Sequence, residues 1–374
     1  RLCMAENKMK RKHLIYVDVL NIMSCFAVVM LHVSLNVFNP SDAYWTQSVL
    51  FQSIAIFAVP IFFMISGMNL IGYADKYDTK TFFKKRLWRV GRALILASVF
   101  CYILFCIFPF SFYGAEQYAS GIGVGDFVSR FLTNSINDIY WFLYTIIYLY
   151  MLTPLLTQIR NDKNILQYLI VLQFSISILI PLIERLGVSK KYFGTLFNWP
   201  LFSSSALLYF LLGFYIANYL RKLPPLWLTG IICVISVGAM FFGGLYTNGY
   251  FAVRDIEYHS YVISTSSPLC VVEAVSLFLC AMQVEQRLQE MPPTVSHCIR
   301  EISGASLGVY LFHILVINWM GKRNWGNASQ FWGEHMGVRA IAVYLVTLIV
   351  VVTCRHILMQ IKKVFTNRRL DRVA

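Results

Sequence analysis

The stretch NIMSCFAVVMLHVSLNVF, residues 21–38, is almost entirely apolar and contains one imidazole, that of His32. The whole chain has this character, because 58% of its 374 residues are hydrophobic and only 13% are charged. A soluble domain carries about twice that charged fraction. Residues 49–73 and 139–159 are free of charge over 25 and 21 residues, which is enough to cross a bilayer. The sequence therefore predicts a polytopic membrane protein.

The apolar runs predict an all-α membrane protein, a bundle of about ten transmembrane helices. The expected bounds are 15–37, 49–73, 91–110, 138–159, 165–183, 201–220, 226–243, 261–284, 303–321 and 338–361. The ninth of these is short and opens on a glycine-containing segment. We therefore expect three parts, which are a basic N-terminus at 1–14, the ten-helix membrane domain at 15–361 and a basic tail at 362–374.

Lysine and arginine gather in the N-terminus, in the second connection at 76–89 and in the tail. With ten spans these segments lie on one side, which the positive-inside rule identifies as the cytoplasm. Both termini are then cytoplasmic, and we expect a multi-pass protein of the bacterial inner membrane. The net charge of +14 should contact anionic membrane lipid. No nucleic-acid partner is expected, because the basic residues flank helices and form no separate domain.

Few ionisable side chains fall inside the predicted spans, where they are costly and tend to face a cavity or a partner. The main ones are Asp18, His32, Glu273 and His313. Each also has a structural explanation, because one backbone carbonyl can satisfy a buried histidine and a carboxylate suits the start of a helix. Two histidines on separate spans favour a polar site. Glu273 fits a proton relay and helix packing equally well.

The first predicted helix carries a polar stripe. Asn21 and His32 are eleven residues apart, so they share one face and lie roughly 16 Å apart along the axis. Asp18 lies near the same face but some 21 Å from His32, so the two cannot touch. A group that orients His32 must come from another helix. The candidates are Glu273, Ser66 and Tyr140.

The segment TKTFFKKRLWRVGRAL, residues 79–94, places Arg86 and Arg89 three residues apart on one face of a helical turn. Two guanidinium groups so placed can fork a phosphate or a pyrophosphate. Ordinary positive-inside decoration is the alternative explanation. The nine cysteines form no CxxC or Cys/His set with metal-ligand spacing, so no metal site is expected.

Five segments resemble, in order, the motifs of the acyltransferase-3 family, integral membrane O-acyltransferases of surface carbohydrates. YVDVLNIMSCFAVVMLHVS is similar to the first helix of the family, with Asp18 and His32 at its Asp and His positions, and KKRLWRV matches its Arg-x-x-Arg motif. The other three segments are VPIFFMISGMNL (59–70), YWFLYTIIYLYMLTPLL (140–156) and SLGVYLFHILVI (306–317). Two positions depart from the pattern. Asn21 stands where most members have Arg or Lys, and Tyr140 or its neighbourhood stands where many have His, which suggests a different acceptor or weakened activity.

The resemblance implies transfer of an acyl group, most often acetyl, from cytoplasmic acyl-CoA to a hydroxyl of a cell-surface glycan or its lipid-linked precursor. Acetyl-CoA or another acyl-CoA would be the donor substrate, with no tightly bound cofactor. Arg86 and Arg89 would bind the CoA phosphates, His32 would be the general base or briefly the acyl carrier, and Asp18 would shape the inner end of the path. The residues expected to line the site or contact substrate are His313, Tyr310, Trp141, Ser66 and Glu273.

A competing class is a membrane exporter or flippase of glycan or lipid-linked sugar, with His32, Glu273 and His313 as relay groups. A CoA enzyme needs the Arg86/Arg89 pair to bind its donor, whereas a flippase should tolerate neutral residues there. A third class, an inactive scaffold for glycan-assembly enzymes, is favoured only by the departure at Asn21.

Overall fold

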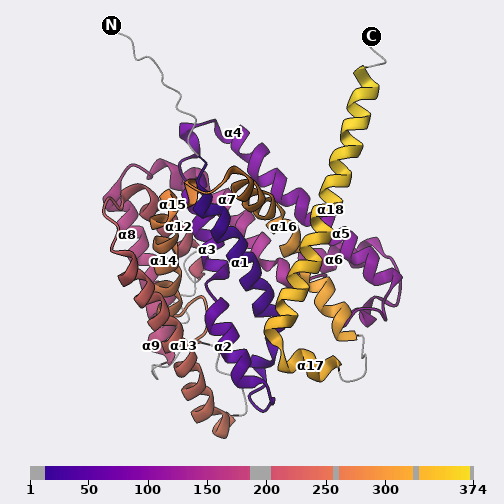
Figure 1. Ribbon diagram of the computed structural model, residues 1–374, viewed down its shortest axis with the longest axis horizontal. Helices are drawn as coiled ribbons and strands as arrows, with labels where there is room; N and C mark the ends of the chain where they lie inside the picture. The colour runs from indigo at the N-terminus through magenta and orange to yellow at the C-terminus, as the bar shows by residue number, and fades with distance from the viewer. Residues whose placement is uncertain (1–12, 186–203, 256–260, 323–327, 371–374) are drawn as a thin grey trace.

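The computed structural model describes residues 13–185, 204–255, 261–322 and 328–370. The protein is 82% helix, and the described ranges contain no strand. Of the predicted basic segments, residues 1–12 of the N-terminus and residues 371–374 of the tail lie outside these ranges. The described residues confirm an all-helical membrane architecture (Figure 1).

Eight helical segments of the described chain are long and apolar enough to cross a membrane. Their bounds are Ile15–Val33, Trp45–Asp75, Thr79–Ile107, Asp138–Gln158, Lys163–Arg185, Leu226–Asn248, Pro293–Lys322 and Met336–Ile361. Two shorter apolar helices, α12 (Ser205–Tyr219) and α14 (Pro268–Gln283), occupy the places of the sixth and eighth predicted spans. A total of ten spans and the cytoplasmic position of the termini stay predictions.

The second predicted span, 49–73, is broken. It divides into α2 (Trp45–Ala55) and α3 (Ala58–Leu70), and Pro60 lies four residues after Ile56, at the break. A proline has no N–H to give and its ring clashes with the carbonyl four residues before it, so the regular hydrogen bonding of the helix is interrupted here.

Two other predicted bounds also need correction. The first helix, α1 (Ile15–Val33), ends before the short helix η1 (Leu35–Phe38). The ninth predicted span is not short, because α16 (Pro293–Lys322) is 30 residues long. It begins on a proline, whose fixed backbone angle suits the first turn, and it runs straight through Gly304 and Gly308. These glycines lie against Arg355 and Val351 of α18 (Met336–Leu370), so they mark helix packing and not a helix start.

Four pairs of helices lie side by side: α3 with α12, α1 with α16, α16 with α18, and α14 with α13 (Leu226–Asp255). The tightest approach is between α3 and α12. A Cβ added at Gly67 would lie 1.7 Å from the carbonyl oxygen of Phe210, and one added at Gly213 would lie 2.0 Å from that of Met64. The two backbones are therefore in direct contact, as small residues allow in membrane helix pairs.

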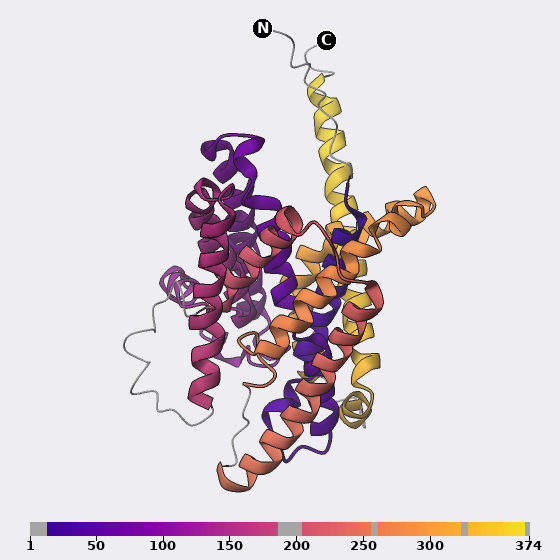
Figure 2. The same ribbon diagram turned by 90° about the vertical axis from the view of Figure 1, so that its left-hand side faces the viewer.

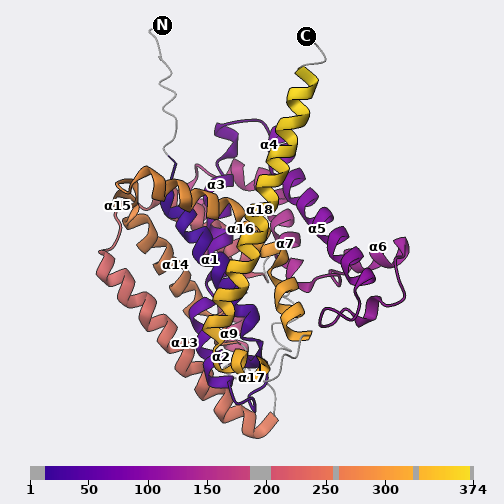
Figure 3. The same cartoon turned by 45° about the vertical axis from the view of Figure 1, so that its right-hand side comes forward.

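The start of α1, the short helix α4 (Thr79–Phe82) and the last turns of α18 all lie at one end of the molecule (Figures 1 and 3), and α18 extends beyond the other helices there (Figure 2). The π turn η3 (Phe83–Leu87) and the start of α5 (Trp88–Ile107) follow α4 and carry the Arg pair. We refer to this end, defined by the start of α1, α4 and residues 83–89, as the basic end. His32, the last residue but one of α1, lies toward the other end of that helix.

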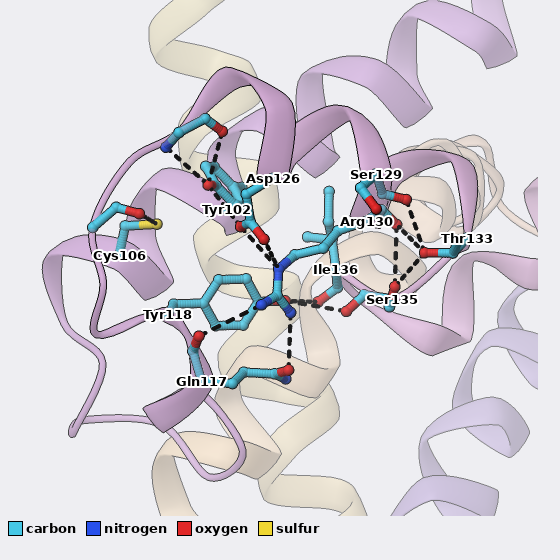
Figure 4. Close-up of polar contacts among 12 residues, drawn as sticks. Tyr102, Cys106, Gln117, Tyr118, Asp126, Ser129, Arg130, Thr133, Ser135 and Ile136 are labelled. Atoms are coloured by element: carbon cyan, nitrogen blue, oxygen red, sulfur yellow. Dashed lines mark hydrogen bonds and ion pairs between the residues drawn. The ribbon is translucent and has the colours of Figure 1, made fainter.

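The connection between α5 and α7 (Trp141–Gln158) is a folded unit that contains η4 (Glu116–Tyr118) and α6 (Val124–Leu132). The Tyr102 hydroxyl donates to Asp126 at 2.9 Å, Arg130 pairs with the same carboxylate at 2.9 Å, and the Arg130 guanidinium lies 4.5 Å from the centre of the Tyr118 ring (Figure 4). The Tyr102 and Arg130 donors lower the pKa of Asp126. These contacts fasten α6 against the end of α5.

The glycine contact yields a stability prediction. Gly67→Ala and Gly213→Ala should each destabilise the fold by about 1–3 kcal/mol, because the added methyl group drives two backbones apart. Thermal unfolding of the purified protein measures the effect. Gly238→Ala on α13 is the control, since a Cβ there meets nothing within 4 Å. Equal melting temperatures for all three variants would contradict the backbone contact.

Candidate active site

The half-buried imidazole of His32 meets the fully buried imidazole of His313 between α1 and α16. His313 Nε2 lies 3.3 Å from His32 Nδ1, and the ring centres are 5.0 Å apart. His32 Nδ1 also lies 2.8 Å from the Val28 carbonyl oxygen. His313 Nδ1 lies 3.1 and 2.8 Å from the carbonyl oxygens of Val309 and Tyr310. The group that orients His32 is thus His313, and Glu273, Ser66 and Tyr140 are not among its described contacts.

These partners determine which nitrogen carries the proton. A neutral imidazole has one N–H, and a backbone carbonyl can only accept. Each Nδ1 therefore carries the N–H of its ring. His313 Nε2 is then unprotonated and accepts from His32 Nδ1, while His32 Nε2 is left as the basic nitrogen of the pair. The Val28 carbonyl therefore holds His32 in one tautomer, and His313 Nε2 is a second, more distant acceptor of the same N–H.

His32 lines a cavity of about 190 Å³. Trp141 and Tyr310 line the same cavity, as do Gln52 and Thr265. The break between α2 and α3 places Gln52, Ile56 and Val59 in this wall. The structure therefore brings together four predicted site residues, which are His32, His313, Tyr310 and Trp141. It adds Gln52 and Thr265, which the sequence did not single out.

Two tyrosines fasten the start of α7 to α16. The Tyr310 hydroxyl donates to the Ile139 carbonyl, and the Tyr140 hydroxyl donates to the Leu311 carbonyl at 3.0 Å. Tyr140 is 1% exposed and lies beside Cys101, at 3.4 Å. Its hydroxyl thus positions the cavity wall, which is its role in this chain at the place where many family members are expected to carry histidine.

Asp138 is a charged residue next to the cavity that the sequence did not single out. It opens η5 (Asp138–Tyr140), just before α7, and its side chain is exposed. The next residue, Ile139, lines the His32 cavity. The signal in the sequence was an acidic residue directly before an apolar run, a pattern that is common at helix starts and therefore carries little weight alone.

Asp18 lies far from the imidazoles, as its spacing predicted. It is buried near the basic end, where it accepts hydrogen bonds from Ser303 Oγ at 2.7 Å and from His13 Nε2. Asn21 lies in the same cluster, with its Nδ2 3.5 Å from Ser303 Oγ. Asp18 thus connects α1 with α16 and with His13, two residues before α1.

The Arg pair and Ser66 form a third group. The guanidinium charges of Arg86 and Arg89 act on the buried Tyr150 hydroxyl, and Ser66 lies beside that hydroxyl. Tyr150 stands on α7, nine residues after Trp141, so about 14 Å of helix separates the two residues. The turn η3, which carries Arg86, packs against α7, the same helix that leads to the cavity.

Glu273 stands apart from these groups. It is 1% exposed on α14, and its Oε2 has no hydrogen-bond partner among the described residues. Within the same residues, no group of three His, Cys, Asp or Glu side chains is placed to hold a metal ion.

The sequence matches the family model described as "Acyltransferase domain" (Acyl_transf_3) over residues 14–356. This match covers nearly the whole chain and contains every predicted site residue. No curated protein and no solved structure matches the chain.

The tautomer assignment can be tested without any substrate. In ¹⁵N-histidine NMR spectra of the protein in nanodiscs, His32 and His313 should both show a protonated Nδ1 and an unprotonated Nε2, because both Nδ1 atoms face carbonyl oxygens. The single variants His32→Gln and His313→Gln identify the two sets of signals. A protonated Nε2 on His32 in the neutral ring would rule out the arrangement described.

Proposed function

The chain belongs to the acyltransferase-3 family, and from this premise we propose that it is a membrane O-acyltransferase for a cell-surface glycan or its lipid-linked precursor. The donor is cytoplasmic acyl-CoA, most often acetyl-CoA, and the acceptor is a sugar hydroxyl. One observation carries the proposal, namely that His32 keeps a basic Nε2 while His313 and Val28 hold its Nδ1–H.

The reaction follows from that tautomer. His32 Nε2 takes the proton of the acceptor hydroxyl as its oxygen attacks the thioester carbonyl, forming the new C–O bond. The tetrahedral intermediate collapses with loss of the C–S bond, and the CoA sulfur leaves with the proton from His32 Nε2. Such proton transfer contributes about 10²–10⁴-fold to rate. His313 stabilises the intermediate imidazolium by accepting its Nδ1–H.

The donor side rests on the basic end, which we propose faces the cytoplasm. Arg86 and Arg89 act on the Tyr150 hydroxyl from α5 and η3, and two guanidinium groups suit the CoA pyrophosphate. The remaining distance along α7, from Tyr150 to the cavity at Trp141, is one that an extended pantetheine arm can bridge. Ser66 lies beside this path.

The acceptor side rests on the cavity. Its size suits one sugar-sized group and not a polymer strand, which favours an enzyme over a glycan exporter. Trp141 is 47% exposed and can stack on a sugar ring, and the exposed Asp138 can accept from sugar hydroxyls. The charge of Asp138 would also stabilise the His32 imidazolium.

The central test is acetyl-CoA binding and turnover by the protein in nanodiscs. His32→Gln should retain acetyl-CoA affinity and lose about a hundredfold or more in turnover, because only the base is removed. Arg86→Gln and Arg89→Gln should each weaken binding about tenfold or more, because each removes charge-assisted hydrogen bonds.

Lys84→Gln is the matched control for the Arg variants. Lys84 lies in the same π turn as Arg86 and is exposed, so its loss changes the charge without removing a phosphate fork. An active His32→Gln enzyme would overturn the assignment of the base. Wild-type protein without affinity for acetyl-CoA would overturn the enzyme proposal and favour a transporter.

A second prediction concerns Asp138. Asp138→Asn should slow turnover severalfold, because it removes the carboxylate charge that would stabilise the His32 imidazolium, while acetyl-CoA affinity is unchanged. Asp42→Asn is the control, since Asp42 Oδ1 accepts from the Tyr44 backbone N–H at 2.8 Å, a bond that an amide oxygen also makes. Equal turnover of Asp138→Asn and wild type would exclude this role.

A further inference from the structure

A polar cavity at the basic end has no role in the mechanism above. It has a volume of about 280 Å³ and lies where α3, α7 and α12 end. Its lining is polar, in contrast to the apolar wall around His32. The polar and charged residues that line it are Asn69, Asp75, Lys76, Arg160, Asn161, Asn218 and Tyr219.

Arg160 is held in place from several directions. Its Nη1 donates to the Thr157 carbonyl at 2.9 Å, its Nη2 pairs with Asp75 Oδ1 at 2.8 Å, and its own carbonyl accepts from the Tyr219 hydroxyl at 2.6 Å. The Arg160 side chain lines the cavity, and these contacts hold its guanidinium in place there. Its positive charge is therefore available to an anionic ligand in the cavity.

Asn69 and Asn218, which also line the cavity, each use one N–H in a hydrogen bond within their own helix. Asn69 Nδ2 donates to the Ile65 carbonyl, and Asn218 Nδ2 donates to the Phe214 carbonyl, each at 2.9 Å within its own helix. Each amide then retains its oxygen and one N–H for a ligand. The rings of Phe214 and Tyr219 supply the apolar part of the wall.

This combination fits one chemical class. Two cations, Lys76 and Arg160, outweigh the single carboxylate of Asp75, so the cavity favours an anion. Cations bind phosphate, aromatic rings can stack on a nucleobase, and amides can pair with its edge or with a ribose hydroxyl. A phosphorylated nucleoside uses all three features.

The position of the cavity indicates which phosphorylated nucleoside it would bind. Along α7 lie Trp141 at the His32 cavity and Tyr150 at the Arg pair. Arg160 at the polar cavity follows two residues after α7 ends at Gln158, so about 12 Å of helix and a short turn separate it from Tyr150. Lys76 and Arg86 are also joined by one short segment of chain. Acyl-CoA carries its thioester, its pyrophosphate and its 3′-phosphorylated adenosine in this same order.

We propose that the cavity lined by Lys76, Arg160 and Asn218 binds the 3′-phosphoadenosine end of the acyl-CoA donor. The inference rests on the proposed function, because it assigns a second part of the same substrate. If the cavity binds the 3′-phosphate, the protein should bind acetyl-CoA more tightly than 3′-dephospho-acetyl-CoA.

The experiment measures the affinity of both compounds for the protein in nanodiscs of neutral phosphatidylcholine. Wild type should bind acetyl-CoA about tenfold or more tightly than the dephospho compound, as a hydrogen-bonded charge pair allows. Lys76→Gln and Arg160→Gln should bring this ratio close to one while leaving affinity for the dephospho compound nearly unchanged. Lys76 is exposed, so its variant is informative even if Arg160→Gln fails to fold.

Lys80→Gln is the matched control, because Lys80 lies four residues after Lys76 on α4 and outside the cavity. It should keep the wild-type ratio. A wild-type ratio near one, or a ratio that survives in both cavity variants, would overturn the inference and leave the proposed function standing. Failure of wild type to bind either compound would overturn the proposed function itself.

A membrane phosphate is the competing ligand. Repeating the measurement in nanodiscs that contain anionic phosphatidylglycerol tests it. The ratio should hold in wild type. A ratio that collapses there, in a way that depends on Lys76, would identify the cavity as a lipid headgroup site and overturn the assignment to the nucleotide.

Discussion

The backbone contact between α3 and α12 is the constraint on which the two cavities depend. Gly67 and Gly213 let the helices touch without intervening side chains, which fixes the position of α3 along and across its partner. At one end of α3 the break at Pro60 exposes the wall that His32 lines. At its other end Asn69 and Gly72 meet Asn218 and Tyr219. A shift of α3 relative to α12 would therefore change the shape of both the His32 cavity and the Arg160 cavity.

The imidazole pair obeys the rule that polar groups in a membrane interior must find partners within the protein. Three of the four ring nitrogens are satisfied by backbone carbonyls or by each other. Because these partners accept from both Nδ1 atoms, a basic atom remains only at His32 Nε2, beside the cavity. The hydrogen bonds that satisfy the buried ring nitrogens therefore also leave His32 Nε2 as the basic atom. The Val28 carbonyl fixes the tautomer of His32, and His313 adds a second acceptor for the same N–H from another helix.

The sequence was a good guide wherever the signal was local. Apolar run length predicted the membrane helices, and residue spacing showed correctly that Asp18 and His32 cannot touch. Contacts between residues far apart in the chain could not be predicted from the sequence. The partner of His32 lies 281 residues away, and the sequence offered Glu273, Ser66 and Tyr140 instead. Pro60 could have predicted the break in the second span, because its effect on the preceding turn is local. The cavity at Arg160 depends on three helix ends and has no contiguous motif.

The Asp18 cluster gives the departure at Asn21 a physical meaning. The resemblance implies a basic residue at position 21, one turn from the carboxylate. In this chain Asn21 approaches Ser303, and the nitrogen on Asp18 comes from His13. His13 lies outside the helix and its side chain is 51% exposed, whereas the second donor to the carboxylate, Ser303 Oγ, comes from α16. The Asp18 carboxylate is therefore satisfied by groups from two other segments of the chain. Because its hydrogen bonds do not come from position 21, that position can carry a neutral amide.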